Sequence, residues 1–100
     1  MTDPVRVFLC DDVPDIRMLM RFALEEDSEV RVVGEADDGL AAVGRIERDA
    51  ARVVAMIGLE LDGDHDAFWL IRAVREEYPQ VLVLAIGTDL DKVAIFRALL

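Results

Sequence analysis

Hydrophobic positions along the chain follow two alternating patterns. Four short segments are apolar almost throughout, and the longer segments between them repeat apolar residues every three or four positions. A strand that is apolar on both faces belongs in a parallel sheet with helices on each side, whereas the longer pattern predicts amphipathic helices. The predicted strands are Val5–Cys10, Val30–Ala36, Val53–Ile57 and Val81–Ile86.

The first helix is predicted to begin at Pro14, because proline suits a first helical turn. Asp37-Asp38-Gly39 supplies turn and capping chemistry before a second helix over Leu40–Arg48, and a fourth helix begins near Thr88 and continues to the last residue. Strands and helices therefore alternate, which predicts an α/β doubly wound parallel sheet. Two helices carry an apolar stripe that we expect to face the core, made of Ile16, Leu19, Met20, Ala23 and Leu24 in the first and of Ala67, Leu70, Ile71 and Val74 in the third.

The chain has 100 residues, of which 11 are basic and 21 acidic, so its formal net charge is -10. This length predicts one compact domain. The acidic balance opposes non-specific binding to nucleic acid or to an anionic membrane. Cys10 is the only cysteine, which excludes an intrachain disulfide and fits a reducing compartment. Because no apolar run reaches the length of a membrane span and no signal peptide precedes the first strand, we expect a cytoplasmic location.

Two adjacent acids, Asp11 and Asp12, follow the first predicted strand. Carboxylates at the tip of a central strand supply part of an oxygen-ligand site for a hard cation such as magnesium (Mg2+), and Glu60 is a candidate further ligand. Where a third acid would complete the cluster, however, the chain has Ile57-Gly58. The expected site is therefore weak or vestigial, and a solvated loop or a cap for the first helix is the simpler interpretation.

Val5–Asp12 followed by Pro14 resembles the opening of bacterial response-regulator receiver domains. Val30–Gly39 resembles the second strand and following turn of the LuxR/NarL-type subfamily, which carries a C-terminal helix-turn-helix. The resemblance covers nearly the whole chain and is weakest between Ala50 and Phe68. It implies a CheY-like (βα)5 receiver fold, of which this chain supplies about four βα units.

The end of the chain bears on its domain organisation. The last predicted helix finishes on Ala98-Leu99-Leu100 without a C-cap and with apolar side chains to cover. We therefore expect residues 1–100 to form a receiver-like domain that stops before its last strand and helix. The resemblance implies that a DNA-binding helix-turn-helix output domain lies outside this chain.

Receiver domains of this family accept a phosphoryl group on an aspartate after the third strand, and this chain lacks that aspartate. Counting without gaps from the acid pair puts Ile57 at the position, whereas matching Leu59–Gly63 to the family's usual loop puts Gly58 there. Neither side chain offers the oxygen nucleophile that phosphoryl transfer requires. The Ser or Thr that usually ends the fourth strand is Ala85. We therefore expect a pseudo-receiver of a two-component-type response regulator and not an enzyme. We expect it to act by protein contact in place of phosphorylation and to control transcription through a DNA-binding domain outside this chain.

Two alternatives remain open. A working receiver could accept the phosphoryl group on another acid, such as Asp62. The acids of the loop Asp62–Asp66 could also be read as a calcium site, but the loop lacks a bidentate acid at its far end. His65 has no cysteine or histidine partner with which to bind zinc. We therefore expect a solvated loop. The other alternative is a doubly wound small-molecule-binding domain, which the absence of a glycine-rich phosphate loop after the first strand disfavours.

Partner contact is expected on two helices. Trp69 falls opposite the core stripe of the third helix, where it should face water and either anchor a partner or lie across arginine side chains. Ile95 and Leu99 lie away from the stripe of the last helix, so they either form a binding face or are covered by missing C-terminal elements. The expected partner is a signalling protein or a second copy of the chain, with DNA bound only through the absent output domain.

Overall fold

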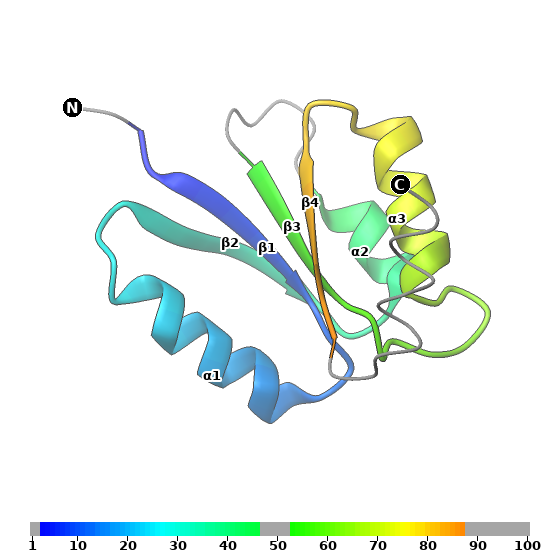
Figure 1. Ribbon diagram of the computed structural model, residues 1–100, viewed down its shortest axis with the longest axis horizontal. Coiled ribbons are helices and arrows are strands. Elements are labelled where there is room, and N and C mark those ends of the chain that lie inside the picture. Colours follow the sequence, from blue (N-terminus) through cyan, green and yellow to red (C-terminus); the bar gives the residue numbers. More distant parts are fainter. Residues whose placement is uncertain (1–2, 47–52, 88–100) are drawn as a thin grey trace.

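The computed structural model describes residues 3–46 and 53–87, and this part of the chain forms an open sheet with helices on both faces (Figure 1). Strands and helices alternate along it. In chain order the elements are β1 (Val5–Cys10), α1 (Pro14–Glu25), β2 (Val30–Ala36), α2 (Gly39–Arg45), β3 (Val53–Gly58), α3 (Ala67–Glu77) and β4 (Leu82–Ile86). The predicted α/β doubly wound architecture is confirmed.

The described strands are all parallel and lie in the order β2-β1-β3-β4. Cys10 at the end of β1 pairs with Ile57 near the end of β3, and Ile57 pairs in turn with Ala85 of β4. The carboxyl ends of parallel strands meet at one edge of a sheet. This register therefore brings the segments after β1, β3 and β4 close together.

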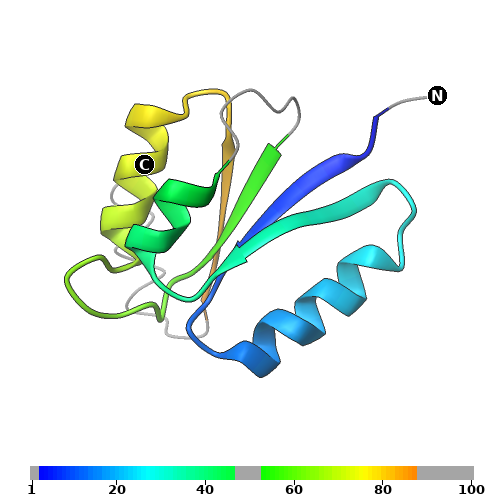
Figure 2. The same cartoon turned by 180° about the vertical axis from the view of Figure 1, so that it is seen from behind.

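α1 lies on one face of the sheet, and α2 and α3 lie together on the other (Figures 1 and 2). Because side chains alternate between the two faces of a strand, the strands contribute to two separate groups of buried residues. The larger group fills the space under α2 and α3 and includes Phe8, Cys10, Ile57, Leu70 and Val74. The smaller group lies under α1 and consists of Val7, Leu9 and Met56, with Met20 and Leu24 packed against it.

The two predicted core stripes have different outcomes. In α3 the prediction is confirmed, since Ala67, Leu70, Ile71 and Val74 are all buried. In α1 it is wrong, because no residue of this helix is buried, and Ile16 and Leu19 are 43% and 61% exposed. α1 contacts chiefly β2, at one side of the sheet, so only the part of its stripe around Met20 and Leu24 reaches the core.

The helices are short, and α2 differs from its prediction at both ends. Asp38 caps α2 by accepting a hydrogen bond from the backbone N–H of Ala41 at 2.8 Å, so the helix begins at Gly39. It ends at Arg45, because Ile46 has an extended backbone.

Among the described residues, no helix is both long enough and apolar enough to span a membrane. The predicted last helix lies outside the described residues.

Candidate functional site

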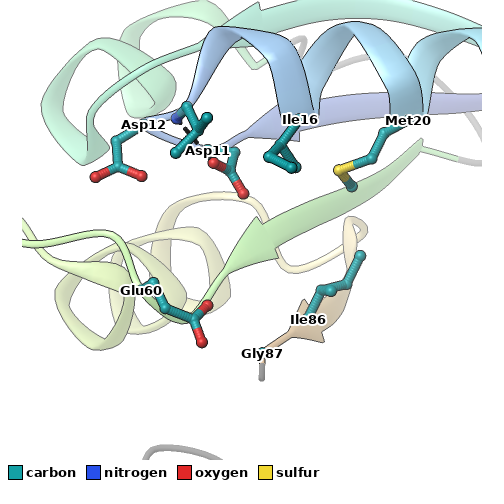
Figure 3. Close-up of a pocket in the computed structure, with 8 residues that line it drawn as sticks. Asp11, Asp12, Ile16, Met20, Glu60, Ile86 and Gly87 are labelled. Atoms are coloured by element: carbon teal, nitrogen blue, oxygen red, sulfur yellow. Dashed lines mark hydrogen bonds between the residues drawn. The ribbon is translucent and has the colours of Figure 1, made fainter. Parts of the chain in front are cut away.

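A pocket of about 270 Å³ lies at the carboxyl edge of the sheet, between the start of α1 and the ends of β3 and β4 (Figure 3). Acidic side chains form one part of its wall. Ile16 and Met20 extend from α1 toward Ile86 on β4 and form an aliphatic part. None of the lining residues is a cation; they are Asp11, Asp12, Val13, Ile16, Met20, Glu60, Ile86 and Gly87.

Asp11 is held through both its backbone and its side chain. Its backbone N–H donates to the carbonyl oxygen of Ala36 at 3.2 Å, and its carboxylate accepts a hydrogen bond from the backbone N–H of Val13 at 2.9 Å. The carboxylates of Asp11 and Glu60 face the same space, whereas Asp12 points to one side (Figure 3). The three acids therefore surround one end of the pocket without converging on a single point.

Two arginines of α1 turn away from the pocket, toward β2. Arg17 donates to the backbone carbonyl oxygen of Asp11, and its Nε lies 3.2 Å from Oε1 of Glu35. Arg21 also forms an ion pair with Glu35. This network ties α1 to β2 and to the loop that carries the acids. Sequence reasoning missed it, because Glu35 becomes a neighbour of Arg17 only once β2 lies beside β1.

Gly58 lies directly beside the acid pair, and Ile57 does not. A Cβ atom added at Gly58 would stand 2.6 Å from Oδ2 of Asp11 and 3.3 Å from its Cγ. The side chain of Ile57 points the other way, into the buried group under α2 and α3, and is 1% exposed. Of the two positions that the sequence left open, the geometry thus places Gly58 at the acids.

The residues present do not fit a strong magnesium site. Within residues 3–46 and 53–87, no three carboxylate, imidazole or thiolate groups come close enough together to hold a metal ion. Magnesium demands a near-octahedral set of oxygen ligands. Asp11, Asp12 and Glu60 line a shared pocket, but Asp12 points to one side of it, and Gly58 beside Asp11 has no side-chain oxygen.

The acidic loop after β3 does not join this site. Asp66 caps α3 by accepting a hydrogen bond from the backbone N–H of Trp69 at 2.9 Å. Asp62 and Asp64 are exposed, and the ring of His65 contacts the Trp69 ring edge to face, with centroids 4.4 Å apart. The loop therefore caps the start of α3. Among the described residues, its acids do not form a cluster that could hold a calcium ion.

Of the predicted partner-binding residues, Trp69 lies in the part of the chain that the structure describes. Trp69 is half-buried and packs against the core under α2 and α3, so the expectation that it faces water is wrong. Its ring also contacts the ring of His65. Ile95 and Leu99 lie outside the described residues.

Cys10, which pairs with Ile57 across the sheet, is chemically quiet. Burial, together with the nearby negative charges of Asp38 and Asp11, raises the pKa of its thiol from 9.0 to about 12. The thiolate is the reactive form of cysteine, and it is scarce at neutral pH under these conditions. Cys10 therefore belongs to the core and not to the chemistry of the pocket.

Comparison with known proteins identifies the fold. No family model matches the chain. The isolated REC domain of RcsB from Salmonella enterica serovar Typhimurium, solved in the presence of phosphomimetic BeF3-, is 25% identical with a TM-score of 0.78 over 95% of this chain and 73% of that chain. The chain has the receiver fold of response regulators. A second structure, the RcsB–DNA complex, superimposes on this receiver domain with a TM-score of 0.83 at 24% identity, over 97% of this chain and 50% of that chain.

Curated relatives of the receiver domain carry an enzyme name. The protein-glutamate methylesterase/protein-glutamine glutaminase 2 of Methanospirillum hungatei is 32% identical over 97 residues, which are 94% of this chain and 27% of the relative. The methylesterase/glutaminase of Azospirillum brasilense is 44% identical over 54 residues, or 54% of this chain and 14% of the relative. The receiver domain thus spans 14% to 27% of the length of these relatives. Because the chain spans so little of these relatives, the match does not show that the chain has their named activity.

Proposed function

We propose that this receiver domain is a pseudo-receiver, which transmits a signal by binding other proteins and does not accept a phosphoryl group. The observation that supports the proposal is the position of Gly58. A side chain there would be directed at the Asp11 carboxylate, since its Cβ would lie 2.6 Å from Oδ2. The residue beside the acid pair is the one that phosphoryl acceptance needs to be a carboxylate, and glycine has none.

The remaining chemistry of the pocket supports the same proposal. A phosphoryl acceptor must approach the phosphorus in line with the leaving group, with cations neutralising the developing charge. Ala85 offers no hydroxyl to the phosphate, and the wall of the pocket contains no cation. We propose that Asp11, Asp12 and Glu60 bind Mg2+ weakly or not at all. We also propose that this chain has no catalytic activity of its own.

The proposed output is a separate domain of a larger cytoplasmic regulator. The resemblance of Val30–Gly39 to LuxR/NarL-type receivers favours a helix-turn-helix that controls transcription, and one of the similar solved structures is described as an RcsB–DNA complex. DNA would then be bound only through that domain. A second candidate output is a methylesterase/glutaminase domain, favoured by the names of the curated relatives. In either case the direct partner of the receiver domain is a signalling protein or a second copy.

The test is incubation with acetyl phosphate and Mg2+, followed by intact mass spectrometry, with a phosphorylatable receiver domain treated in parallel as a control for the donor. We expect no stable gain of one phosphoryl group on the wild-type chain. A stable gain would overturn the proposal. If that gain disappears in Asp62→Asn, the alternative of a working receiver with Asp62 as acceptor is correct.

The small-molecule-binding alternative is tested separately by a thermal-shift screen against nucleotides. A ligand that binds only the folded state raises the melting temperature in proportion to the logarithm of its concentration above Kd. The pseudo-receiver proposal predicts no such shift. Strong stabilisation by one nucleotide would favour the alternative.

A further inference from the structure

The sequence contains two Asp-Gly pairs, Asp38-Gly39 and Asp62-Gly63. An aspartate that precedes glycine closes a five-membered succinimide ring more readily than other aspartates, because glycine has no Cβ to hinder the approach of its amide nitrogen to the carboxyl carbon. The ring forms only where the carboxyl group and the backbone are free to rotate. The fold treats the two pairs differently in this respect.

Asp38 and Gly39 are held at the start of α2. The carboxylate of Asp38 accepts a hydrogen bond from the backbone N–H of Ala41 at 2.8 Å. Gly39 is buried, and a Cβ atom placed there would stand 2.4 Å from the backbone carbonyl oxygen of His65. Ring closure at this pair would therefore break the helix cap and move a backbone that is packed against the loop before α3.

Asp62 and Gly63 lie in the loop between β3 and α3, which projects from the domain (Figures 1 and 2). Both residues are exposed, and a Cβ atom added at Gly63 would meet nothing within 4 Å. Gly63 has a φ of 96°, a backbone conformation that other residues rarely adopt. The amide nitrogen of Gly63 therefore reaches the carboxyl carbon of Asp62 without displacing packed structure.

The ends of the same loop are anchored. Leu61 and Ala67 are 3% and 0% exposed, and the backbone N–H of Ala67 donates to the carbonyl oxygen of Leu61 at 3.3 Å. Between these anchors Asp66 caps α3, and the ring centroid of His65 lies 4.4 Å from that of Trp69. A change in backbone length between the anchors must be absorbed inside the loop, so it moves His65.

We propose that Asp62-Gly63 is a site of spontaneous isoaspartate formation and that the modification disturbs the contact between His65 and Trp69. First, the amide nitrogen of Gly63 bonds to Cγ of the protonated Asp62 carboxyl group, and the amide hydrogen and the carboxyl hydroxyl leave as water. Water then adds to one of the two ring carbonyls. Addition at Cγ restores aspartate, whereas addition at the backbone carbonyl breaks the original peptide bond and leaves Gly63 joined through Cγ.

The isoaspartate product has the same mass as the starting chain, and its formation needs no oxidant or cofactor. It lengthens the main chain by one carbon atom and leaves a carboxylate beside it, which is the group that protein isoaspartate methyltransferases methylate. The modified chain should therefore accept a methyl group from S-adenosylmethionine at residue 62. This inference is independent of the proposed function, since it requires neither a phosphoryl group nor a signalling partner.

The test follows the 100-residue chain during prolonged warm incubation at neutral pH. Isoaspartate is located by peptide mapping with electron-transfer fragmentation and is counted by enzymatic methylation. We expect it to accumulate about tenfold faster at Asp62 than at Asp38, since Asp38 must first lose its cap. In urea, where neither pair is held by the fold, the two rates should come close together.

Asp62→Asn and Asp38→Asn form a matched pair of variants, because asparagine closes the same ring with loss of ammonia and also caps helices well. In the folded chain the first should deamidate at least about tenfold faster than the second. Asp62→Glu is the negative control, because a glutamate side chain would have to close a larger ring, and it should lose the methylation. Trp69 is the only tryptophan, so its fluorescence should change in the incubated wild type and stay constant in Asp62→Glu.

Equal rates at the two pairs in the folded chain would overturn the proposal. So would the absence of isoaspartate at Asp62 under conditions in which the chain reacts in urea, or methylation that persists undiminished in Asp62→Glu. Unchanged Trp69 fluorescence in a chain modified at Asp62 would overturn the effect on the contact with His65.

Discussion

Gly58→Ala tests directly how closely Asp11 approaches Gly58, the proposed position of the missing acceptor. The added Cβ would stand 2.6 Å from Oδ2 of Asp11, which is far inside van der Waals contact. The carboxylate must therefore move. Because Asp11 is partly exposed and its carboxylate is the far end of a short flexible side chain, it can rotate toward water, but it then loses its 2.9 Å hydrogen bond from Val13.

The magnitude follows from two opposing effects. Loss of one hydrogen bond lowers the free energy of unfolding by about 1 kcal/mol. Replacing glycine by alanine restricts the unfolded chain and raises it by about 0.4–1 kcal/mol. The expected change in the free energy of unfolding for Gly58→Ala is therefore below about 1 kcal/mol, in spite of the short contact.

Two other glycines supply the comparison. A Cβ at Gly39 would stand 2.4 Å from the backbone carbonyl oxygen of His65, which no side-chain rotation can relieve, so Gly39→Ala should destabilise the domain by about 2 kcal/mol. Gly44 has nothing within 4 Å of such an atom and lies exposed in α2, so Gly44→Ala should stabilise it by about 0.5–1 kcal/mol.

The assay is urea denaturation of the three variants, combined with amide hydrogen exchange and the amide NMR shift of Val13. Gly58→Ala should leave the denaturation midpoint close to that of the wild type but should change the Val13 signal and speed its exchange. A loss of about 2 kcal/mol or more in Gly58→Ala would show that Asp11 is fixed in place, contrary to our reasoning. An unchanged Val13 amide would show that Asp11 does not occupy the space beside Gly58.

Further predictions concern contacts around the site. Arg17→Ala should lower the free energy of unfolding by about 1–2 kcal/mol in urea, and by less when Glu35→Gln is already present; additive losses would contradict a shared network. Tyr78→Phe removes the hydrogen bond from a buried hydroxyl to the Val43 carbonyl, 2.5 Å away, and should cost about 1–2 kcal/mol; no change in Tm would contradict it. The pKa of Cys10 is raised from 9.0 to about 12, chiefly by burial, so the unfolded thiol ionises first. The stability that this thiol contributes should be complete below pH 9.0 and lost as pH rises toward about 12, a decline that should be weaker in Cys10→Ala.

The strands and the third helix were predictable from sequence because burial alone decides them. A segment such as Val53–Gly58, which is apolar on both faces, has few places in a small domain other than the middle of a covered sheet. The stripe of α3 is buried as predicted because α3 is backed by α2 and by the strands β3 and β4. In these elements the local pattern and the final environment agree.

α1 shows where this reasoning stops. Its apolar stripe is as regular as that of α3, yet Leu19 is 61% exposed, because the elements that cover a helix are set by the order of the strands and not by the helix itself. The same order puts Arg17 beside Glu35. Trp69 is a related case, since it packs against the core and contacts the ring of His65, and no periodic pattern encodes where the loop places His65.

The choice between Ile57 and Gly58 shows why a single residue of register matters for function. Successive residues of a strand face opposite sides, so an error of one position exchanges a core side chain for one at the edge of the site. The ungapped count selects Ile57, but a charged acceptor at that position would have to enter the packed group that holds Phe8 and Leu70. A side chain at Gly58 would instead be directed at the carboxylate of Asp11. The proposed loss of phosphoryl chemistry therefore depends on Gly58, where a restored carboxylate would compete with Asp11 for space and so need a second change to accommodate it.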